Sequence, residues 1–178
     1  MLTIGQAIRD AIISHARADH PDEACGMVAG PVGSDRPVRF IPMTNAERSP
    51  TFYSFESGEK LRAFREMDDR DEEPVVIYHS HTATEAYPSR TDLAEADFPG
   101  THYVIVSTRD TDGGGEFQFR SFLVTGGVAV EEEIRVVPDA ELGGAASAAP
   151  GSEPESGSEP ESGSEPESGS KPTPEAAG

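Results

Sequence analysis

Two histidines one residue apart follow an apolar run in the middle of the chain, in "PVVIYHSH", which ends at His81. Side chains alternate between the two faces of a strand, so His79 and His81 point to the same side while Ser80 points away. Two imidazoles at this distance can share a metal ion. Catalytic zinc usually takes three protein ligands and leaves a fourth position for water, so this pattern predicts two ligands and requires a third.

The third ligand that we predict is Asp92, in the segment "SRTD". This segment has the form of a helix start, with Ser89 as the cap and Asp92 in the first turn. The loop 82–88 is long enough to fold that turn back over the histidines. Taken alone, the histidine pair could lie at the end of a strand without binding a metal. Taken alone, Ser89 and Asp92 could form an ordinary helix cap without a catalytic role. The joint pattern is expected by chance only about once in a thousand chains of this composition.

Hydrolysis at such a centre also needs a group that accepts a proton from water and passes it to the leaving amine. The chain has 33 acidic residues, so composition does not choose among them. Glu23 lies in "HPDEACGMVAG", directly before an apolar strand, where its side chain would be partly desolvated; the alternative is an ordinary loop glutamate. Cys25 in the same segment is a second candidate, as a thiol nucleophile, but its apolar context favours a buried, inert thiol.

These residues need a framework, and the pattern of apolar residues predicts an α+β fold with a mixed sheet flanked by helices. The expected helices are 3–18, with Thr3 as its cap, 56–68 and 92–97. The expected strands are 25–31, 36–43, 74–81, 102–108, 117–124 and 128–137, with a hairpin loop at 110–115.

The composition changes sharply near the end of the chain, which predicts a folded domain at 1–140 and a disordered acidic tail at 141–178. Seven glutamates, one lysine and no aromatic or large aliphatic residue follow residue 144, and the hexapeptide GSEPES occurs three times in succession. Such a segment buries too little apolar surface to offset the entropy of ordering it. We interpret "ELGG" at 141–144 as a flexible exit from the domain.

The net charge of −19 over 178 residues argues against binding to nucleic acid or to anionic membranes, which need basic surface. No signal peptide or transmembrane segment is evident. The chain has one cysteine, so it forms no internal disulfide, and we expect a cytoplasmic protein. A zinc deaminase would need H-x-E and P-C-x-x-C motifs, and neither is present. The sequence does not predict an oligomeric state.

Together, Glu23, the pair His79 and His81, and then Ser89 and Asp92 resemble the full signature of the JAMM (MPN+) zinc metallopeptidases. The resemblance covers roughly residues 7–137. It implies a mixed sheet flanked by helices, in a cytidine-deaminase-like architecture, and one zinc ion held by both histidines and the aspartate. It also implies that Glu23 acts as general base and then general acid, and that the Ser89 hydroxyl stabilises the oxyanion.

The surroundings of the motif, such as "IPMTNAERSPTFY" and "VVIYHSHTATEAYPSRTD", are similar to those of the Mec-type hydrolases within this family. This similarity implies hydrolysis of the amide between cysteine and the C-terminal di-glycine of a ubiquitin-like sulfur carrier protein of the CysO type, which releases cysteine. Two alternatives stay open. One is an isopeptidase that removes ubiquitin-like modifiers from protein lysines, and the other is a metal-free MPN scaffold.

Overall fold

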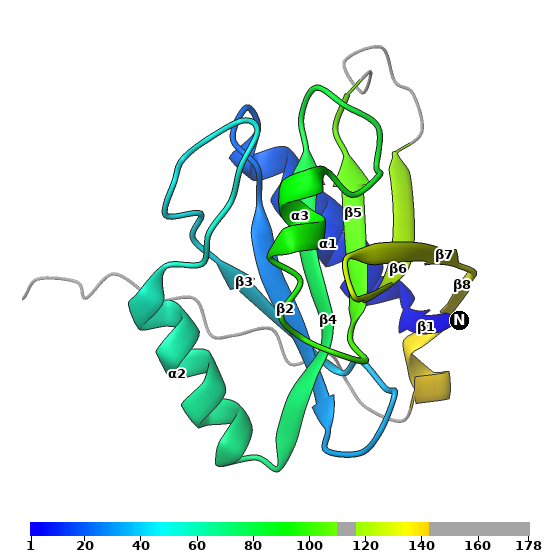
Figure 1. Cartoon of the computed structure of the whole chain (residues 1–178). Coiled ribbons are helices and arrows are strands. Elements are labelled where there is room, and N and C mark those ends of the chain that lie inside the picture. Colours follow the sequence, from blue (N-terminus) through cyan, green and yellow to red (C-terminus); the bar gives the residue numbers. More distant parts are fainter. Residues whose placement is uncertain (110–116, 143–178) are drawn as a thin grey trace, which may run out of the picture.

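The computed structural model describes residues 1–109 and 117–142 (Figure 1). The elements follow in the order β1 (Leu2–Gly5), α1 (Gln6–Asp19), β2 (Cys25–Pro31), β3 (Arg39–Met43), α2 (Ser57–Asp68), β4 (Glu72–His81), α3 (Arg90–Ala94), β5 (His102–Ser107), β6 (Gln118–Thr125), β7 (Val128–Glu132), β8 (Ile134–Val137) and the 3₁₀ helix η2 (Asp139–Leu142).

The central element is a six-stranded sheet in the order β3-β2-β4-β5-β6-β7. Strands β4 and β5 are parallel, and the other neighbouring pairs are antiparallel. Strands β1 and β8 form a separate parallel pair. A mixed sheet with helices on it is the α+β class that the apolar pattern predicts, so that prediction is confirmed.

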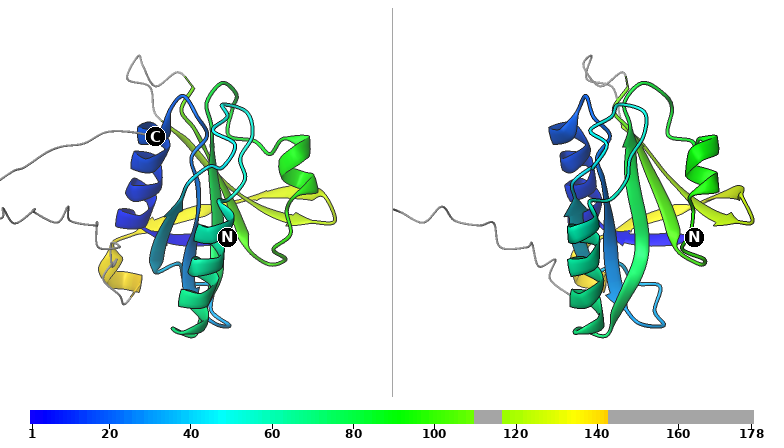
Figure 2. Two further views of the ribbon diagram at one scale, coloured as in Figure 1. Left: turned by 90° about the vertical axis from the view of Figure 1, so that its left-hand side faces the viewer. Right: turned by 60° about the vertical axis from the view of Figure 1, so that its left-hand side comes forward.

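Helix α1 covers one face of the large sheet, whereas α2 and α3 lie over the other (Figure 2). Two separate apolar clusters follow from this. Val76 and Tyr78 of β4 pack in the cluster that contains α1, and Ile77 packs in the cluster that contains α2. Because side chains alternate along a strand, His79 and His81 continue the row of Ile77. The histidines therefore lie on the face that carries α2 and α3.

The first residues of the chain differ from the prediction. Leu2–Gly5 is a strand rather than the start of a helix, and α1 begins at Gln6 with Gly5 as its N-cap and no side-chain cap. Thr3 is therefore not the cap. The reason is tertiary, because Leu2 and Ile4 are fully buried once β1 pairs with β8. The strand predicted at 128–137 is likewise two strands, since β7 pairs with β6 while β8 pairs with β1.

Two predictions lie partly or wholly outside the described residues. The hairpin loop at 110–115 is one of them, although β5 and β6 are antiparallel neighbours as a hairpin requires. The tail is the other. The predicted boundary at residue 140 falls within η2, and 143–178 are not described, so the division into domain and tail stays a prediction. No helix in the described part of the chain is long and apolar enough to cross a membrane.

Candidate metal centre and active site

The two histidines stand at the C-terminal end of β4, a central strand that pairs with β2 on one side and β5 on the other. Both are buried, with exposed fractions of 2% for His79 and 5% for His81. Their Nε2 atoms lie 3.1 Å apart. The strand therefore presents two imidazole nitrogens to one point in space, as the alternation of side chains predicts.

Helix α3, which lies over the sheet (Figure 1), brings Asp92 to the same point. Its Oδ2 lies 3.5 Å from Nε2 of His79 and 3.4 Å from Nε2 of His81. A capping box orients the aspartate, because the Ser89 hydroxyl accepts from the Asp92 backbone N–H at 3.2 Å and Oδ2 accepts from the Ser89 N–H at 2.6 Å. The short helix thus serves to aim one carboxylate at the histidine pair.

The donor set fits a metal cation. The backbone carbonyl of Glu85 lies 2.9 Å from Nδ1 of His81, and a carbonyl only accepts, so Nδ1 carries the proton and the neutral ring leaves a lone pair on Nε2. That lone pair faces the carboxylate of Asp92 and the second imidazole, with the three ligand atoms all within 4.8 Å of one another. A cation relieves the repulsion among such groups, and two imidazoles with one carboxylate suit zinc.

The charge states agree with this interpretation. Burial raises the pKa of Asp92, but the interactions of its carboxylate with the imidazoles of His79 and His81 outweigh burial and hold the pKa well below its usual range. Burial lowers the pKa of His79, so this ring is neutral at pH 7. Burial lowers the pKa of His81 too, but its hydrogen bonds to Asp92 and to the Glu85 carbonyl outweigh burial and raise that pKa. The site therefore offers one carboxylate and two imidazoles, and a bound cation would displace the protons that they share.

The side of the His79 ring that faces away from the centre is held by stacking rather than by a hydrogen bond. Tyr53 lies against it with the ring centroids 4.5 Å apart and an interplanar angle of 21°. Nδ1 of His79 is buried and has no hydrogen-bond partner within the described residues. No spacing signal in the sequence predicts a role for Tyr53 here, because it comes from the loop 44–56.

Glu23 lies beside this centre, two residues before β2, the strand that neighbours β4. Cys25 of β2 is in register with His79, so Glu23, two residues earlier, lies next to His81. Its side chain is 5% exposed. Desolvation raises the pKa of Glu23 to about 7. The field of His81 opposes this rise, and the field of Asp92 adds to it. A carboxyl group with a pKa near the working pH is suited to accept and return a proton.

The backbone of Glu23 is held on both sides by the loop 44–56. The Glu23 N–H donates to the carbonyl of Ser49 at 2.9 Å, and the side-chain amide of Asn45 donates to the carbonyl of Glu23 at 2.9 Å. The same amide group donates to Phe52 and accepts from two backbone N–H groups of the loop. Asparagine is a typical turn residue, but that signal does not reveal which strand it would hold.

The neighbouring side chains have structural roles. Ser80 points to the opposite side from the histidines, where its hydroxyl accepts from the Ala24 N–H at 2.8 Å and locks β4 to the residue after Glu23. Cys25 is buried, and desolvation raises the pKa of its thiol to about 12. A thiol with that pKa is not a nucleophile at neutral pH, in keeping with the buried thiol predicted from its context.

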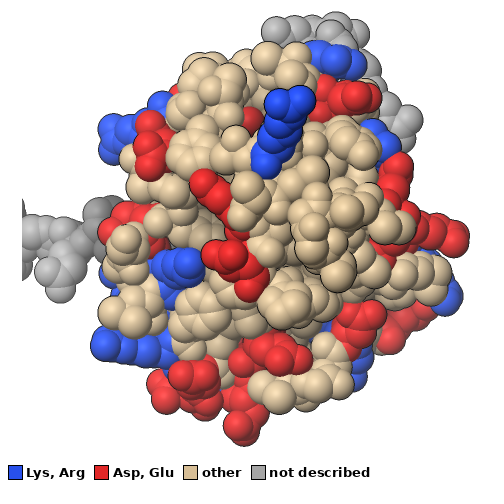
Figure 3. Space-filling view, in the orientation of Figure 1, with Lys and Arg blue, Asp and Glu red and all other residues tan. Residues whose placement is uncertain are grey.

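A groove leads away from the centre between α2 and the segment that follows α3. It has a volume of about 280 Å³, and Tyr53, Lys60, Glu95 and Phe98 line it. Tyr53 thus forms part of the groove wall and also stacks on His79. Figure 3 shows acidic side chains near the middle of this face, beside α3. The groove therefore approaches the candidate metal centre over a surface with negative charge.

The family that matches this chain is described as prokaryotic homologs of the JAB domain, and the match spans residues 5–122. The chain belongs to the prokaryotic JAB family. A CysO-cysteine peptidase from Mycobacterium tuberculosis is 59% identical over 137 residues, which cover 77% of this chain and 92% of that protein. A desampylase from Haloferax volcanii is 32% identical over 111 residues, which cover 60% of this chain and 80% of that protein.

Solved structures agree on the JAB fold. A protein from Desulfitobacterium hafniense, 31% identical, matches with a TM-score of 0.67 over 78% of this chain and 94% of its own. A JAB1/MPN domain protein from Archaeoglobus fulgidus, 21% identical, matches with a TM-score of 0.50 over 76% of this chain and 99% of its own. The resemblance to the JAMM family is confirmed by these matches.

Proposed function

We propose that this JAB protein is a zinc-dependent hydrolase that cleaves the amide between cysteine and the C-terminal glycine of a ubiquitin-like sulfur carrier protein. The supporting observation is the convergence of His79, His81 and Asp92 beside the buried Glu23, in a chain that covers 92% of a CysO-cysteine peptidase at 59% identity. Free cysteine and the carrier would be the products.

His79, His81 and Asp92 would hold the zinc ion. Zinc at a site of this kind supplies Lewis acidity, which lowers the pKa of a water molecule from 15.7 to about 7. The Glu85 carbonyl contributes by fixing the tautomer of His81, and Tyr53 contributes by fixing the plane of the His79 ring.

Glu23 would be the general base and then the general acid. Its carboxylate would accept the proton of the attacking water and donate it to the departing cysteine nitrogen. Its two backbone contacts to the loop 44–56 keep the side chain directed at the centre. A pKa near 7 lets one group both accept and return the proton near neutral pH.

Ser89 would stabilise the oxyanion. Its oxygen accepts from the backbone N–H of Asp92, and its hydroxyl, which also interacts with the Asp92 carboxylate, would turn to donate to the substrate. Loss of one such donor typically costs about 3–4 kcal/mol in the barrier. The groove along Tyr53 and Phe98 would take the extended di-glycine tail of the carrier, whose narrow backbone suits a slot with aromatic walls.

The proposal is tested by intact-mass spectrometry of a sulfur carrier that ends in di-glycine followed by cysteine. The zinc-loaded protein should remove the mass of one cysteine residue, and a chelator or the Glu23→Gln variant should prevent this loss. Glu133→Gln is the matched control, because this glutamate is exposed, lies between β7 and β8, and its side chain has no hydrogen bond or ion pair in the described structure. An unchanged carrier mass with zinc bound would overturn the proposal.

A second candidate rests on the desampylase similarity. An isopeptidase would release a ubiquitin-like modifier from a protein lysine with the same site chemistry. The two reactions differ in what leaves, so the same assay with a carrier joined to a protein lysine separates them. Cleavage of that conjugate, with the carrier–cysteine amide left intact, would favour the isopeptidase.

A further inference from the structure

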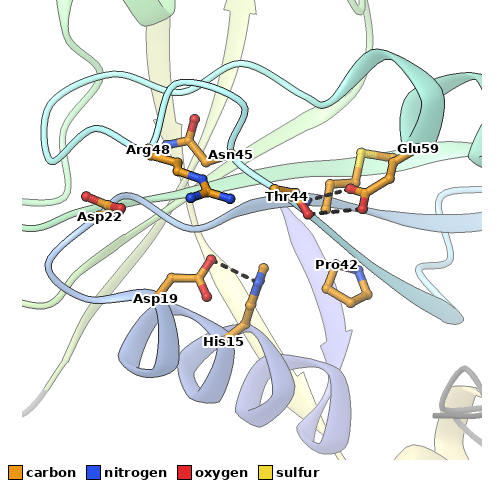
Figure 4. Close-up of a pocket in the computed structure, with 9 residues that line it drawn as sticks. His15, Asp19, Asp22, Pro42, Thr44, Asn45, Arg48 and Glu59 are labelled. Atoms are coloured by element: carbon orange, nitrogen blue, oxygen red, sulfur yellow. Dashed lines mark hydrogen bonds and ion pairs between the residues drawn. The ribbon is translucent and has the colours of Figure 1, made fainter. Parts of the chain in front are cut away.

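A second cavity lies apart from the groove, against α1 and the beginning of the loop 44–56 (Figure 4). Its volume of about 480 Å³ falls in the range of about 300–1,000 Å³ that is usual for small-molecule sites. Charged side chains from three parts of the chain line it: Asp19 at the end of α1, Asp22 in the following turn, and Arg48 in the loop. Pro42 and Met43 add an apolar portion of the wall.

The charges around this cavity divide into paired and unpaired groups. Glu59 accepts from the N–H and the hydroxyl of Thr44 at 2.6 and 3.0 Å and is thereby satisfied. Within the described structure, no hydrogen bond or ion pair involves the side chains of Arg48 or Asp22, and no ion pair within 4.0 Å joins Arg48 to Asp19. Opposite charges therefore line one cavity without neutralising each other.

His15 lies beside Asp19 in the wall of the cavity and adds no positive charge to it. Nε2 of His15 lies 3.3 Å from Oδ2 of Asp19, and Nδ1 of His15 lies 2.8 Å from the Tyr78 hydroxyl. Burial lowers the pKa of His15, against the field of Asp19, so the ring is neutral at pH 7. Asp19 and Asp22 together therefore offer two negative charges opposite one guanidinium.

The backbone conformation of Arg48 is also unusual. Its φ of 45° lies in the left-handed region, which is uncommon for residues with a side chain and which glycine adopts without cost. Arginine at such a position has no evident structural benefit, because its side chain makes no hydrogen bond or ion pair within the described structure. Figure 4 shows the guanidinium directed into the cavity, on the side that faces Asp19.

We propose that this cavity binds a free α-amino acid as a zwitterion. Arg48 would take the α-carboxylate in a bidentate pair, and Asp22 and Asp19 would take the α-ammonium group. The wall formed by Pro42 and Met43 would contact a short side chain. Binding does not depend on the proposed function; only the expectation that cysteine is the natural occupant rests on it, since cysteine would be the product.

The cavity is connected to the active site through one turn of the loop. The Arg48 N–H donates to the Asn45 carbonyl at 3.2 Å. Asn45 and Ser49, which hold the backbone of Glu23, flank Arg48 in the sequence. An occupant that orders Arg48 would therefore order the turn that positions Glu23, and the product would act back on the enzyme through this turn.

The test is isothermal titration calorimetry of the zinc-loaded full chain with L-serine. L-serine is the probe because a thiol would bind the metal. Ethanolamine lacks the carboxylate and 3-hydroxypropionate lacks the ammonium group, so each should bind at least tenfold more weakly than L-serine. Arg48→Gln and Asp22→Asn should each weaken L-serine binding by a similar factor. Arg65→Gln, the same change at an exposed position on α2, should leave it unchanged.

A second variant, Arg48→Gly, removes the steric cost of the left-handed φ at this position. It should therefore fold at least as well as the parent and still lose L-serine binding. No heat of binding up to tens of millimolar L-serine in a folded parent protein would overturn the proposal, as would unchanged binding in the Arg48 variants. Because carrier hydrolysis is measured separately by mass, cysteine release without serine binding refutes this inference alone. Serine binding without hydrolysis refutes the proposed function alone.

Discussion

Replacing Glu23 with glutamine keeps the shape of the side chain and removes its ionisable proton. In the folded protein, desolvation raises the pKa of Glu23 from 4.5 to about 7, and the side chain is almost fully buried. Between pH 4.5 and 7 the folded state therefore binds more protons than the unfolded state. Under linkage, the free energy of unfolding falls as pH rises through this window and stays reduced above it.

The size of the effect follows from the same values. Each pKa unit corresponds to about 1.36 kcal/mol, so the ionised carboxylate destabilises the metal-free protein by about 3 kcal/mol at pH 8. At pH 5 the effect is about 1 kcal/mol, because the unfolded state is then only partly ionised. Glutamine carries no such penalty. Glu23→Gln should therefore be more stable than the parent at pH 8, by an amount that shrinks toward pH 5.

The assay is urea denaturation with a chelator present, at pH 5 and pH 8, for the parent, Glu23→Gln and the control Glu133→Gln. In parallel, zinc-loaded Glu23→Gln should lose turnover of the carrier–cysteine amide by about 10²–10⁴, the usual contribution of a general base. A stability difference that does not change with pH would refute the burial argument. Near-normal turnover would refute the assignment of Glu23 as base, whatever the stability result.

Three further predictions concern other residues. His81→Ala should lose zinc, because two ligands bind it too weakly; inductively coupled plasma mass spectrometry of dialysed protein checks this, and a full metal complement would contradict the ligand assignment. Cys25→Ala should keep most turnover, since burial raises the pKa of the thiol to about 12; loss of turnover with zinc still bound would show that the thiol takes part. Asn45→Ala should lower stability by about 1–3 kcal/mol, because it leaves the buried carbonyl of Glu23 without its donor. It should also lower kcat while the zinc content stays near that of the parent. Denaturation measures the stability and steady-state assays measure kcat; a stability loss with unchanged kcat would limit Asn45 to holding the loop.

Much of the candidate site could be predicted from local pattern. The alternation of side chains along a strand is enough to place His79 and His81 on one side, and the order of Ser89 and Asp92 is enough to predict the capping box that the structure contains. Both are short-range effects, because they depend on backbone geometry within a few residues. The roles that we assign to these residues remain proposals for the experiments above.

The elements that were predicted wrongly have their explanation in distant pairing. Leu2–Gly5 carries the apolar spacing of a helix start, yet β8, more than 120 residues later, pairs with it as a strand. The break between β7 and β8 has the same cause, because the two segments pair with different partners. Local propensity is a weak prior, and burial against a partner overrides it.

By itself the sequence determined the types of the candidate ligands, their spacing and the mixed sheet that carries them, since each depends on periodicity and on the chemistry of single side chains. Only the tertiary structure decided that Tyr53 stacks on His79, that Asn45 holds Glu23, and that Arg48 faces Asp19 across a cavity. These contacts join a loop to strands and a helix far away in the chain. Their geometry depends on how the two apolar clusters pack on opposite faces of the sheet, and no local pattern encodes that packing.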